Sequence, residues 1–213
     1  MALVKYNNNS ISAVSSVASI PSGALVPIKT LTASSSSTLS FVHGSSDVVL
    51  DSTYPIYKFE FINIHPQTQN ALFQVGFRDG STAYDATKTS TLFGAYNYEN
   101  ASSAAIGYRT NRDLAQSTSF QDLIQFALIS DGNDSSLVGN LHLFNPSSTT
   151  FVKHFMAVTN SVNDGSGSDA DYSDNAFIAG YCNTTTAIDG VQFKMSTGNI
   201  DAGTIKLYGI KDS

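Results

Sequence analysis

The feature that most constrains the fold of this chain is a long succession of short apolar or alternating runs, separated by clusters of Ser, Asn, Asp and Gly. In the clearest run, 54–64, the aromatic residues Tyr57, Phe59 and Phe61 alternate with polar or aliphatic residues. Side chains two residues apart share one face of a strand, so this run predicts a strand with an aromatic face. Longer helical segments do not alternate with these runs, which argues against a βαβ architecture.

The remaining runs predict about ten further short strands, the spacing typical of a sandwich or barrel. A jelly-roll-like antiparallel β-sandwich is favoured over residues 28–213, as one domain. A Ser-rich turn at 34–37 predicts a hairpin of the two runs beside it, and 160–175 is expected to be a long polar loop. Segment 120–129 fits either a strand or a short helix. The expected strands are 26–33, 38–43, 71–78, 91–98, 104–109, 137–144, 151–159, 176–182, 191–195 and 204–210.

Residues 1–27 differ from the rest and are interpreted as an N-terminal arm. They are rich in Ser, Ala and Asn, and aliphatic side chains recur every three residues at Ile11, Val14, Val17 and Ile20. This spacing fits a short helical face, but Ser, Val and Ile are mediocre helix formers, so an extended arm fits equally well. We expect these four residues to contact a neighbouring subunit as an oligomer contact or anchor.

Charge and hydropathy exclude several classes of partner. Only 13% of the residues are charged, the net charge is −6, and the basic residues are scattered singly. Because binding to a phosphate backbone needs a basic stripe, nucleic acid is not expected. No stretch has the ~18 apolar residues that a membrane span needs. The first ten residues lack the basic and apolar regions of a signal peptide, so we expect synthesis in the cytoplasm and no membrane insertion.

The residues offer no catalytic apparatus, and neither a cofactor nor a metal is expected. Cys182 is the only cysteine, which excludes an intrachain disulfide and fits a small buried side chain. Glu60 and Glu99 are the only glutamates and show no paired arrangement of the kind that glycosidases use. The four histidines show no compact metal spacing, and no Gly-x-Ser-x-Gly sequence occurs. The residues therefore predict a protein that is not an enzyme.

Two further groups of residues leave alternatives open. In the polar loop, Asp169, Asp171 and Asp174 would supply oxygen ligands to calcium if the loop curled, but a solvated loop is the favoured interpretation. In the 84–112 region, Tyr96, Tyr98 and Tyr108 lie near polar residues. These three tyrosines are candidates for a ligand surface that stacks on sugars, against the alternative that they pack with their hydroxyl groups at the rim.

Three segments, 57–66 (YKFEFINIHP), 139–155 (GNLHLFNPSSTTFVKHF) and 188–210 (IDGVQFKMSTGNIDAGTIKLYGI), carry a family resemblance. The chain resembles the β-rich virion structural proteins of marine tailed phages, including cyanophages, over roughly residues 28–210. The resemblance implies a non-enzymatic, tail-fibre-like or capsid-decorating protein, located in the virion and mounted through its N-terminal arm. It also implies partners among other virion proteins and a homo-oligomer, with a trimer favoured by analogy with fibres. The alternative is an adhesin that binds a glycan of the host surface.

Overall fold

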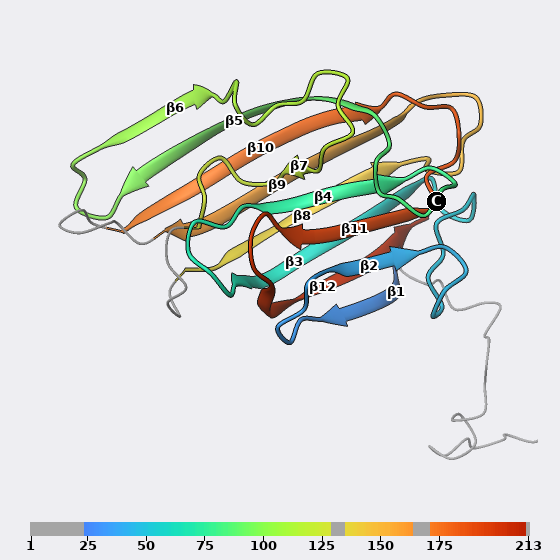
Figure 1. The fold of residues 1–213 in the computed structure, drawn as a ribbon, viewed down its shortest axis with the longest axis horizontal. Helices are drawn as coiled ribbons and strands as arrows, with labels where there is room; N and C mark the ends of the chain where they lie inside the picture. Colours follow the sequence, from blue (N-terminus) through green and yellow to red (C-terminus); the bar gives the residue numbers. More distant parts are fainter. Residues whose placement is uncertain (1–23, 129–134, 164–170, 212–213) are drawn as a thin grey trace, which may run out of the picture.

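The computed structural model of this chain describes residues 24–128, 135–163 and 171–211, and these form an all-β structure (Figure 1). Its twelve strands are β1 Leu25–Thr32, β2 Leu39–Val42, β3 Ile56–Pro66, β4 Phe73–Arg78, β5 Lys88–Tyr98, β6 Ala104–Tyr108, β7 Gln121–Asp122, β8 Leu137–Phe144, β9 Lys153–Asn163, β10 Tyr172–Cys182, β11 Gly190–Met195 and β12 Ile200–Ile210.

The strands form two antiparallel sheets that pack together as a β-sandwich (Figure 1). The large sheet has the order β1-β12-β3-β8-β9-β10-β5-β6, and the small sheet has the order β2-β11-β4-β7. We call β1, β12, β3 and β8 the frame of the large sheet, and β9, β10, β5 and β6 its extension. The predicted antiparallel β-sandwich is confirmed, whereas its jelly-roll connectivity stays a prediction.

Beneath the frame, aromatic side chains fill the space between the sheets. The predicted aromatic face of β3 is confirmed, because Tyr57, Phe59 and Phe61 are all buried. Phe193 of β11 lies at the centre of this cluster, with ring centroids 5.4 Å from Phe59 and 5.2 Å from Phe61. Edge-to-face pairs of this kind add to the stabilisation that burial provides.

The inner face of the extension packs against a different layer. The small sheet ends at the two-residue strand β7, and the rest of segment 109–128 covers this part of the large sheet (Figure 1). The Gln125 side chain donates a hydrogen bond to the carbonyl of Ala95 on β5 at 3.1 Å. The Thr159 hydroxyl of β9 donates to the carbonyl of Leu123 at 2.5 Å. This half of the core therefore depends on polar contacts to irregular backbone as well as on apolar packing.

The hairpin predicted around the 34–37 turn is wrong. The first strand, β1, pairs with β12 in the large sheet, whereas β2 pairs with β11 in the small sheet. The chain changes sheets between them, where Ser36 bridges to Ile200. The predicted arm extends to residue 27, but β1 begins at Leu25, so the last part of that segment belongs to the sandwich.

Two other boundaries differ from the sequence prediction. The polar loop expected at 160–175 is shorter, because β9 continues to Asn163 and β10 begins at Tyr172. The last strand is expected at 204–210, whereas β12 already begins at Ile200. Segment 120–129 contains only the short strand β7, and its described part contains no helix.

Candidate interaction surface

The outer face of the large sheet points away from the small sheet, and its two halves carry different side chains. On the frame, the outward residues of β3 and β12 include an ion pair, Lys58 Nζ to Glu60 Oε1 at 2.8 Å. Lys206 lies directly opposite Glu60 on the neighbouring strand. Single aliphatic residues such as Ile62 lie between these charges. This half of the face has the mixed polar character of an ordinary solvated surface.

On the extension, no outward side chain is Lys, Arg, Asp or Glu. The alternating burial of β9, β10 and β5 and the pairing of β6 with β5 identify the outward residues. We call these residues the apolar face. They are His154, Met156, Val158, Asn160 and Val162 of β9, Ser173, Asn175, Phe177, Ala179 and Tyr181 of β10, Thr89, Thr91, Phe93, Ala95 and Asn97 of β5, and Ala104, Ile106 and Tyr108 of β6.

One row of this face is apolar across four neighbouring strands. The register places Val158 opposite Phe177, Phe177 opposite Phe93, and Phe93 opposite Tyr108. The Phe93 and Phe177 rings stack with centroids 5.1 Å apart and planes within 10°. Directly opposed side chains of this kind are the pairs that stabilise a sheet, yet Phe93 keeps 43% of its surface exposed and Phe177 keeps 40%.

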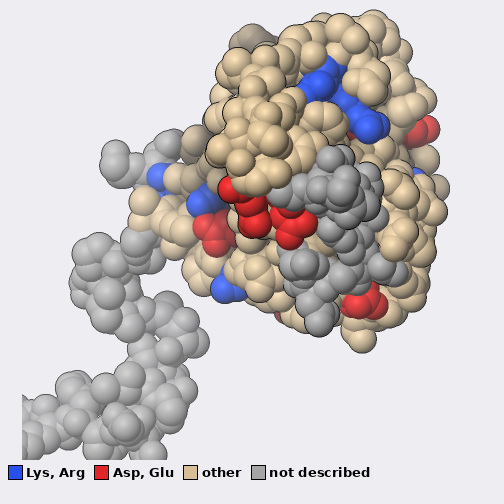
Figure 2. Space-filling view, turned by 90° about the vertical axis from the view of Figure 1, so that its left-hand side faces the viewer, with Lys and Arg blue, Asp and Glu red and all other residues tan. Residues whose placement is uncertain are grey.

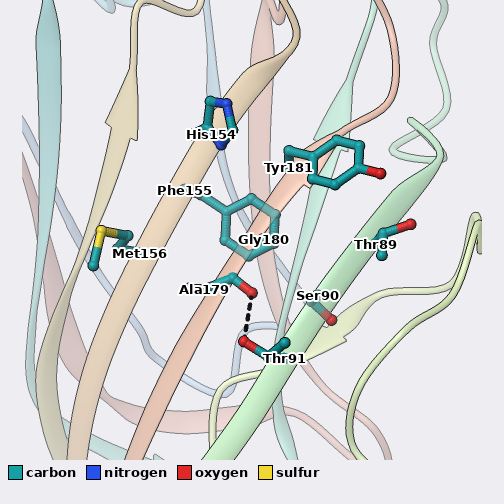
Figure 3. A pocket seen from close by; sticks show the side chains of 9 residues that line it. All are labelled: Thr89, Ser90, Thr91, His154, Phe155, Met156, Ala179, Gly180 and Tyr181. Carbon is teal, nitrogen blue, oxygen red and sulfur yellow. Dashed lines mark hydrogen bonds between the residues drawn. The ribbon is translucent and has the colours of Figure 1, made fainter.

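Beside this row the face is hollowed (Figure 3). Two adjoining depressions, of about 400 Å³ and 320 Å³, share the side chains of Thr91, Met156 and Ala179. The cause lies in β10, where the small residue Ala179 stands between the larger Phe177 and Tyr181. The Thr91 hydroxyl donates a 3.4 Å hydrogen bond to the Ala179 carbonyl, so this donor is already engaged within the sheet.

Among the described residues that line the two depressions, the titratable side chains are His142, His154 and Tyr181. His142 of β8 borders one depression and His154 of β9 borders the other. Their strands, β8 and β9, are neighbours in the large sheet. Burial, and then the charge of Lys58, lower the pKa of His142, which favours the neutral ring beside the apolar face.

The structure brings together two of the three tyrosines expected to form a ligand surface. Tyr96 and Tyr98 point to the inner side of β5, with ring centroids 5.8 Å apart, and Tyr98 lies 4.9 Å from Tyr172. Phe126 completes this aromatic cluster, 5.6 Å from Tyr96. Tyr108 lies on the opposite, outer face, where its hydroxyl donates to Asp113 at 2.6 Å. The three tyrosines therefore do not share one surface.

The aromatic cluster lies toward the end of the sandwich where β5 ends and β10 begins. Figure 2 views the molecule from that end: uncharged side chains cover most of the surface, and most acidic side chains in view form one group. Arg109 lies over the Phe126 ring, 4.3 Å from its centroid, and donates to Gln125 Oε1 at 2.8 Å.

A buried carboxyl group lies close to this cluster. Asp174 of β10 has 1% of its surface exposed and accepts a short hydrogen bond from the Gln125 amide. Its second oxygen and the side-chain oxygen of Asn163 are buried without a hydrogen-bond partner. Burial raises the pKa of Asp174 to about 6, although its bond from Gln125 opposes the shift. A buried carboxylate of this kind is costly unless it is protonated.

Cys182 is buried, as the sequence predicted. It lies between Lys153 and Lys88 on the neighbouring strands, and burial raises the pKa of its thiol to about 12 despite these cations. The thiol is therefore protonated at neutral pH and is not an activated nucleophile. Lys88 and Lys153 donate to the carbonyls of Ala86 and Thr184 at 2.7 Å and 3.0 Å.

Several residues singled out in the sequence lie outside the part of the chain that the structure describes. Ile11, Val14, Val17 and Ile20 lie outside the described residues, as does Asp169 of the proposed calcium loop. Within residues 24–128, 135–163 and 171–211, no three His, Cys, Asp or Glu side chains gather in a metal-binding group. The same part of the chain contains no helix that is long and apolar enough to span a membrane.

Comparison with known proteins adds no family assignment. The chain matches no protein-family model, no curated protein and no solved structure.

Sequence reasoning missed the apolar face, although a signal was present. In a strand with one solvated side, apolar and polar residues alternate. In β5, β9 and β10 this rule is broken by adjacent apolar pairs, which are Leu92-Phe93, Ala157-Val158 and Phe177-Ile178. Such pairs place an apolar side chain on each face and indicate strands that are covered on both sides.

Proposed function

We propose that this chain is a non-enzymatic structural subunit of a virion, which associates with copies of itself through the apolar face. The observation that carries the proposal is the exposed, uncharged surface of the extension, with Phe93, Phe177, Met156 and Val158 at its centre. Large exposed apolar patches mark interaction sites in soluble proteins.

The fold itself does not require an apolar outer face. The frame belongs to the same sheet and carries Lys58, Glu60 and Lys206 on the same side. The four strands β9, β10, β5 and β6, ~4.8 Å apart, and about six residues of ~3.3 Å along each give a face of about 19 Å by 20 Å. This projected area of about 380 Å² is about half of the ~800 Å² that each partner of a standard interface covers. A second copy that covers the apolar face would therefore bury an area at the low end of the range for specific interfaces.

The strand order supports the virion assignment and the finer jelly-roll assignment. The order β1-β12-β3-β8 stands opposite β2-β11-β4-β7, and we propose that these eight strands are a jelly roll to which β5, β6, β9 and β10 were added. Jelly rolls are common in viral capsid proteins. Fold alone does not establish function, so the proposal also depends on the resemblance to structural proteins of marine tailed phages.

In this proposal the protein is a tail-fibre-like or capsid-decorating component, made in the host cytoplasm and carried in the virion. It forms a homo-oligomer, with a trimer favoured by analogy with fibres, and contacts other virion proteins. The N-terminal arm mounts the subunit through Ile11, Val14, Val17 and Ile20. Replacing all four with Ser is expected to prevent incorporation into particles, and normal incorporation would contradict the role of the arm.

Two measurements test the proposal. An antibody label read by electron microscopy is expected on intact particles: label on the capsid favours decoration, and label on the tail favours a fibre. Sedimentation equilibrium of the purified full chain is expected to give a multiple of 22.6 kDa. Absence from particles would contradict the virion role, and a monomer at high micromolar concentration would contradict self-association.

A second candidate function is recognition of a host-surface glycan. The cluster of Tyr96, Tyr98, Tyr172 and Phe126 favours it, because Tyr96 and Tyr98 remain partly accessible. Aromatic faces stack on sugar rings, and loops at the end of a sandwich are common binding sites. Binding of purified protein to host-surface polysaccharide at micromolar concentration, reduced at least tenfold by Tyr98→Ala, would support this function. No binding by the unaltered protein would exclude it.

A further inference from the structure

The free edge of β6 is open and uncharged. This strand, Ala104–Tyr108, ends the large sheet, and its sequence AAIGY contains no charged residue and no proline. Ile106 keeps 75% of its surface exposed, and a side chain added at Gly107 would meet no atom within 4 Å. Open edges of this kind are templates for pairing with another strand.

The hydrogen-bond pattern shows which groups of β6 face the open side. Arg109 donates its N–H to the Leu92 carbonyl, and Tyr98 donates to the Ser103 carbonyl. In an antiparallel pair, hydrogen-bonded and non-hydrogen-bonded positions alternate, so residues 105 and 107 also bond to β5. The backbone groups of Ala104, Ile106 and Tyr108 therefore point away from the sheet.

The other edges of the two described sheets are blunted. Strand β1, at the opposite edge of the large sheet, contains Pro27 and Lys29, with a register shift between them. The edges of the small sheet are β2, with four residues, and β7, with two. Proline, charge, bulges and short length are the devices that prevent edge pairing. Among the described edge strands, β6 is the only one that has at least five residues and also lacks proline, charged residues and a bulge.

We propose that β6 accepts an extended segment from residues 1–23 of a neighbouring copy as an additional strand of the large sheet. This inference rests on the proposed self-assembly and adds a second contact between copies, at the sheet edge, to the contact that the apolar face makes. Main-chain hydrogen bonds to Ala104, Ile106 and Tyr108 provide the attachment, as in other cases of strand addition.

The composition and length of the N-terminal segment suit this role. The 23 residues that precede Ala24 contain a single charged side chain, Lys5. At ~3.3 Å per residue they reach up to about 76 Å, which leaves ample length beyond the few residues needed to pair with β6. Side chains of the added strand would extend the apolar row beside Ile106 and Tyr108, where Ile or Val would pack.

The positions of the two edges favour exchange between copies. The segment begins next to β1 at one edge of the large sheet, whereas β6 forms the other edge. Within one copy the segment would have to cross seven strand spacings, about 34 Å, and about ten of its residues would be used for that crossing alone. Between copies, donation from one edge to the opposite edge is a head-to-tail contact, which closes into a ring when the rotation fits. A cyclic trimer is one such ring.

The test compares two full-length variants of one residue. Ile106→Pro removes the N–H that faces the open edge and leaves the bonds to β5 in place, whereas Ile106→Val keeps it. Sedimentation equilibrium is expected to show association weakened about tenfold or more for Ile106→Pro, since a hydrogen bond is lost and the ring obstructs an incoming strand. Ile106→Val should associate like the unaltered protein. Circular dichroism and thermal melting confirm that both variants fold.

Hydrogen exchange identifies the occupant. In the assembled protein, the amides of Ala104, Ile106 and Tyr108 are expected to be protected. In the full-length variant with Ser at positions 11, 14, 17 and 20, they should exchange at least tenfold faster. Rapid exchange in the assembled protein, or protection that survives the serine substitutions, would overturn the inference. An oligomer that is unaffected by Ile106→Pro would also overturn it while leaving the proposed function intact, whereas a monomeric unaltered protein would contradict both.

Discussion

The frame and the extension are parts of one continuous sheet, yet their outer faces have opposite chemistry. The frame exposes the Lys58–Glu60 ion pair and Lys206, whereas the extension exposes Phe93 and Phe177 and no charge. Strand geometry is shared, so the difference is one of side chains. A strand of this sheet folds with charged outward residues, so the fold does not require the apolar residues of the extension, and the proposed function assigns them to a contact with another copy.

The inner faces of the two halves differ in the opposite way, because the frame covers an apolar core and the extension covers buried polar groups. Beneath the frame, the rings of Phe41, Phe59, Phe61 and Phe73 surround Phe193 in an apolar core. Beneath the extension, polar groups such as Asp174, Gln125 and Ser90 are buried, and Ser90 donates a short hydrogen bond to Gln121. A cluster of five buried phenylalanines thus lies beneath the frame, whereas the buried polar groups and the apolar face belong to the extension.

The largest expected effect on stability is the difference between replacing a buried aromatic residue and replacing one on the apolar face. Phe193→Ala leaves a cavity among four phenylalanines and should lower the free energy of unfolding by about 4 kcal/mol. Phe93→Ala, on the apolar face, should cost less than about 1 kcal/mol in the dissociated chain, since Phe93 is 43% exposed. Urea titration at a concentration where the protein is monomeric measures both. Similar losses for the two variants would break the distinction between core and interface.

The next effect concerns the buried carboxyl group beneath the extension. Because the pKa of Asp174 is raised from 3.8 to about 6, the folded state binds its proton more tightly than the unfolded state. Its stabilising contribution is present below about pH 4 and is lost as the pH rises through about 6, a change of about 3 kcal/mol.

Asp174→Asn tests this titration, because the amide remains neutral at every pH. The variant should be more stable than the unaltered protein at pH 8, by up to about 3 kcal/mol, and close to it at pH 4. Urea titrations of both proteins at the two pH values give the difference. A difference that does not change with pH would show that Asp174 is ionised in the folded state throughout.

The smallest expected effect is on the frame. Glu60→Gln removes one partner of a partly exposed ion pair, which contributes only about 0–1 kcal/mol. Neither the melting temperature nor the oligomeric mass should change appreciably. A large loss of association in this variant would mean that the outer face of the frame also takes part in the interface.

Local patterns predicted much of the fold. The alternation of Tyr57, Phe59 and Phe61 predicted β3 and its buried face, and the run 137–144 matched β8 at both ends. Pairing was harder, because the Ser-rich turn at 34–37 does not reveal that β1 and β2 enter different sheets.

Where the prediction failed, polar residues occupy buried positions. The sequence prediction ended β9 at 159 and began β10 at 176, because polar residues such as Ser161, Asn163 and Asp174 indicated a loop. In the structure these three side chains point inward and are buried, against the rule that inward residues are apolar. The candidate surface could have been recognised from paired apolar residues such as Phe177-Ile178. Its extent could not, because it depends on the order in which β9, β10, β5 and β6 lie side by side.

The central claim, that the apolar face joins copies of the chain, is tested most directly by one matched pair of variants. Val158 of the extension and Ile62 of the frame are both outward β-branched residues with 37% of their surface exposed. Val158→Lys would bury an unpaired charge in the interface and should weaken association by about 100-fold, or about 3 kcal/mol. Ile62→Lys should leave it unchanged. Sedimentation equilibrium of both full-length variants gives the answer: a mass reduced only for Val158→Lys supports the account, and equal masses for the two variants would contradict it.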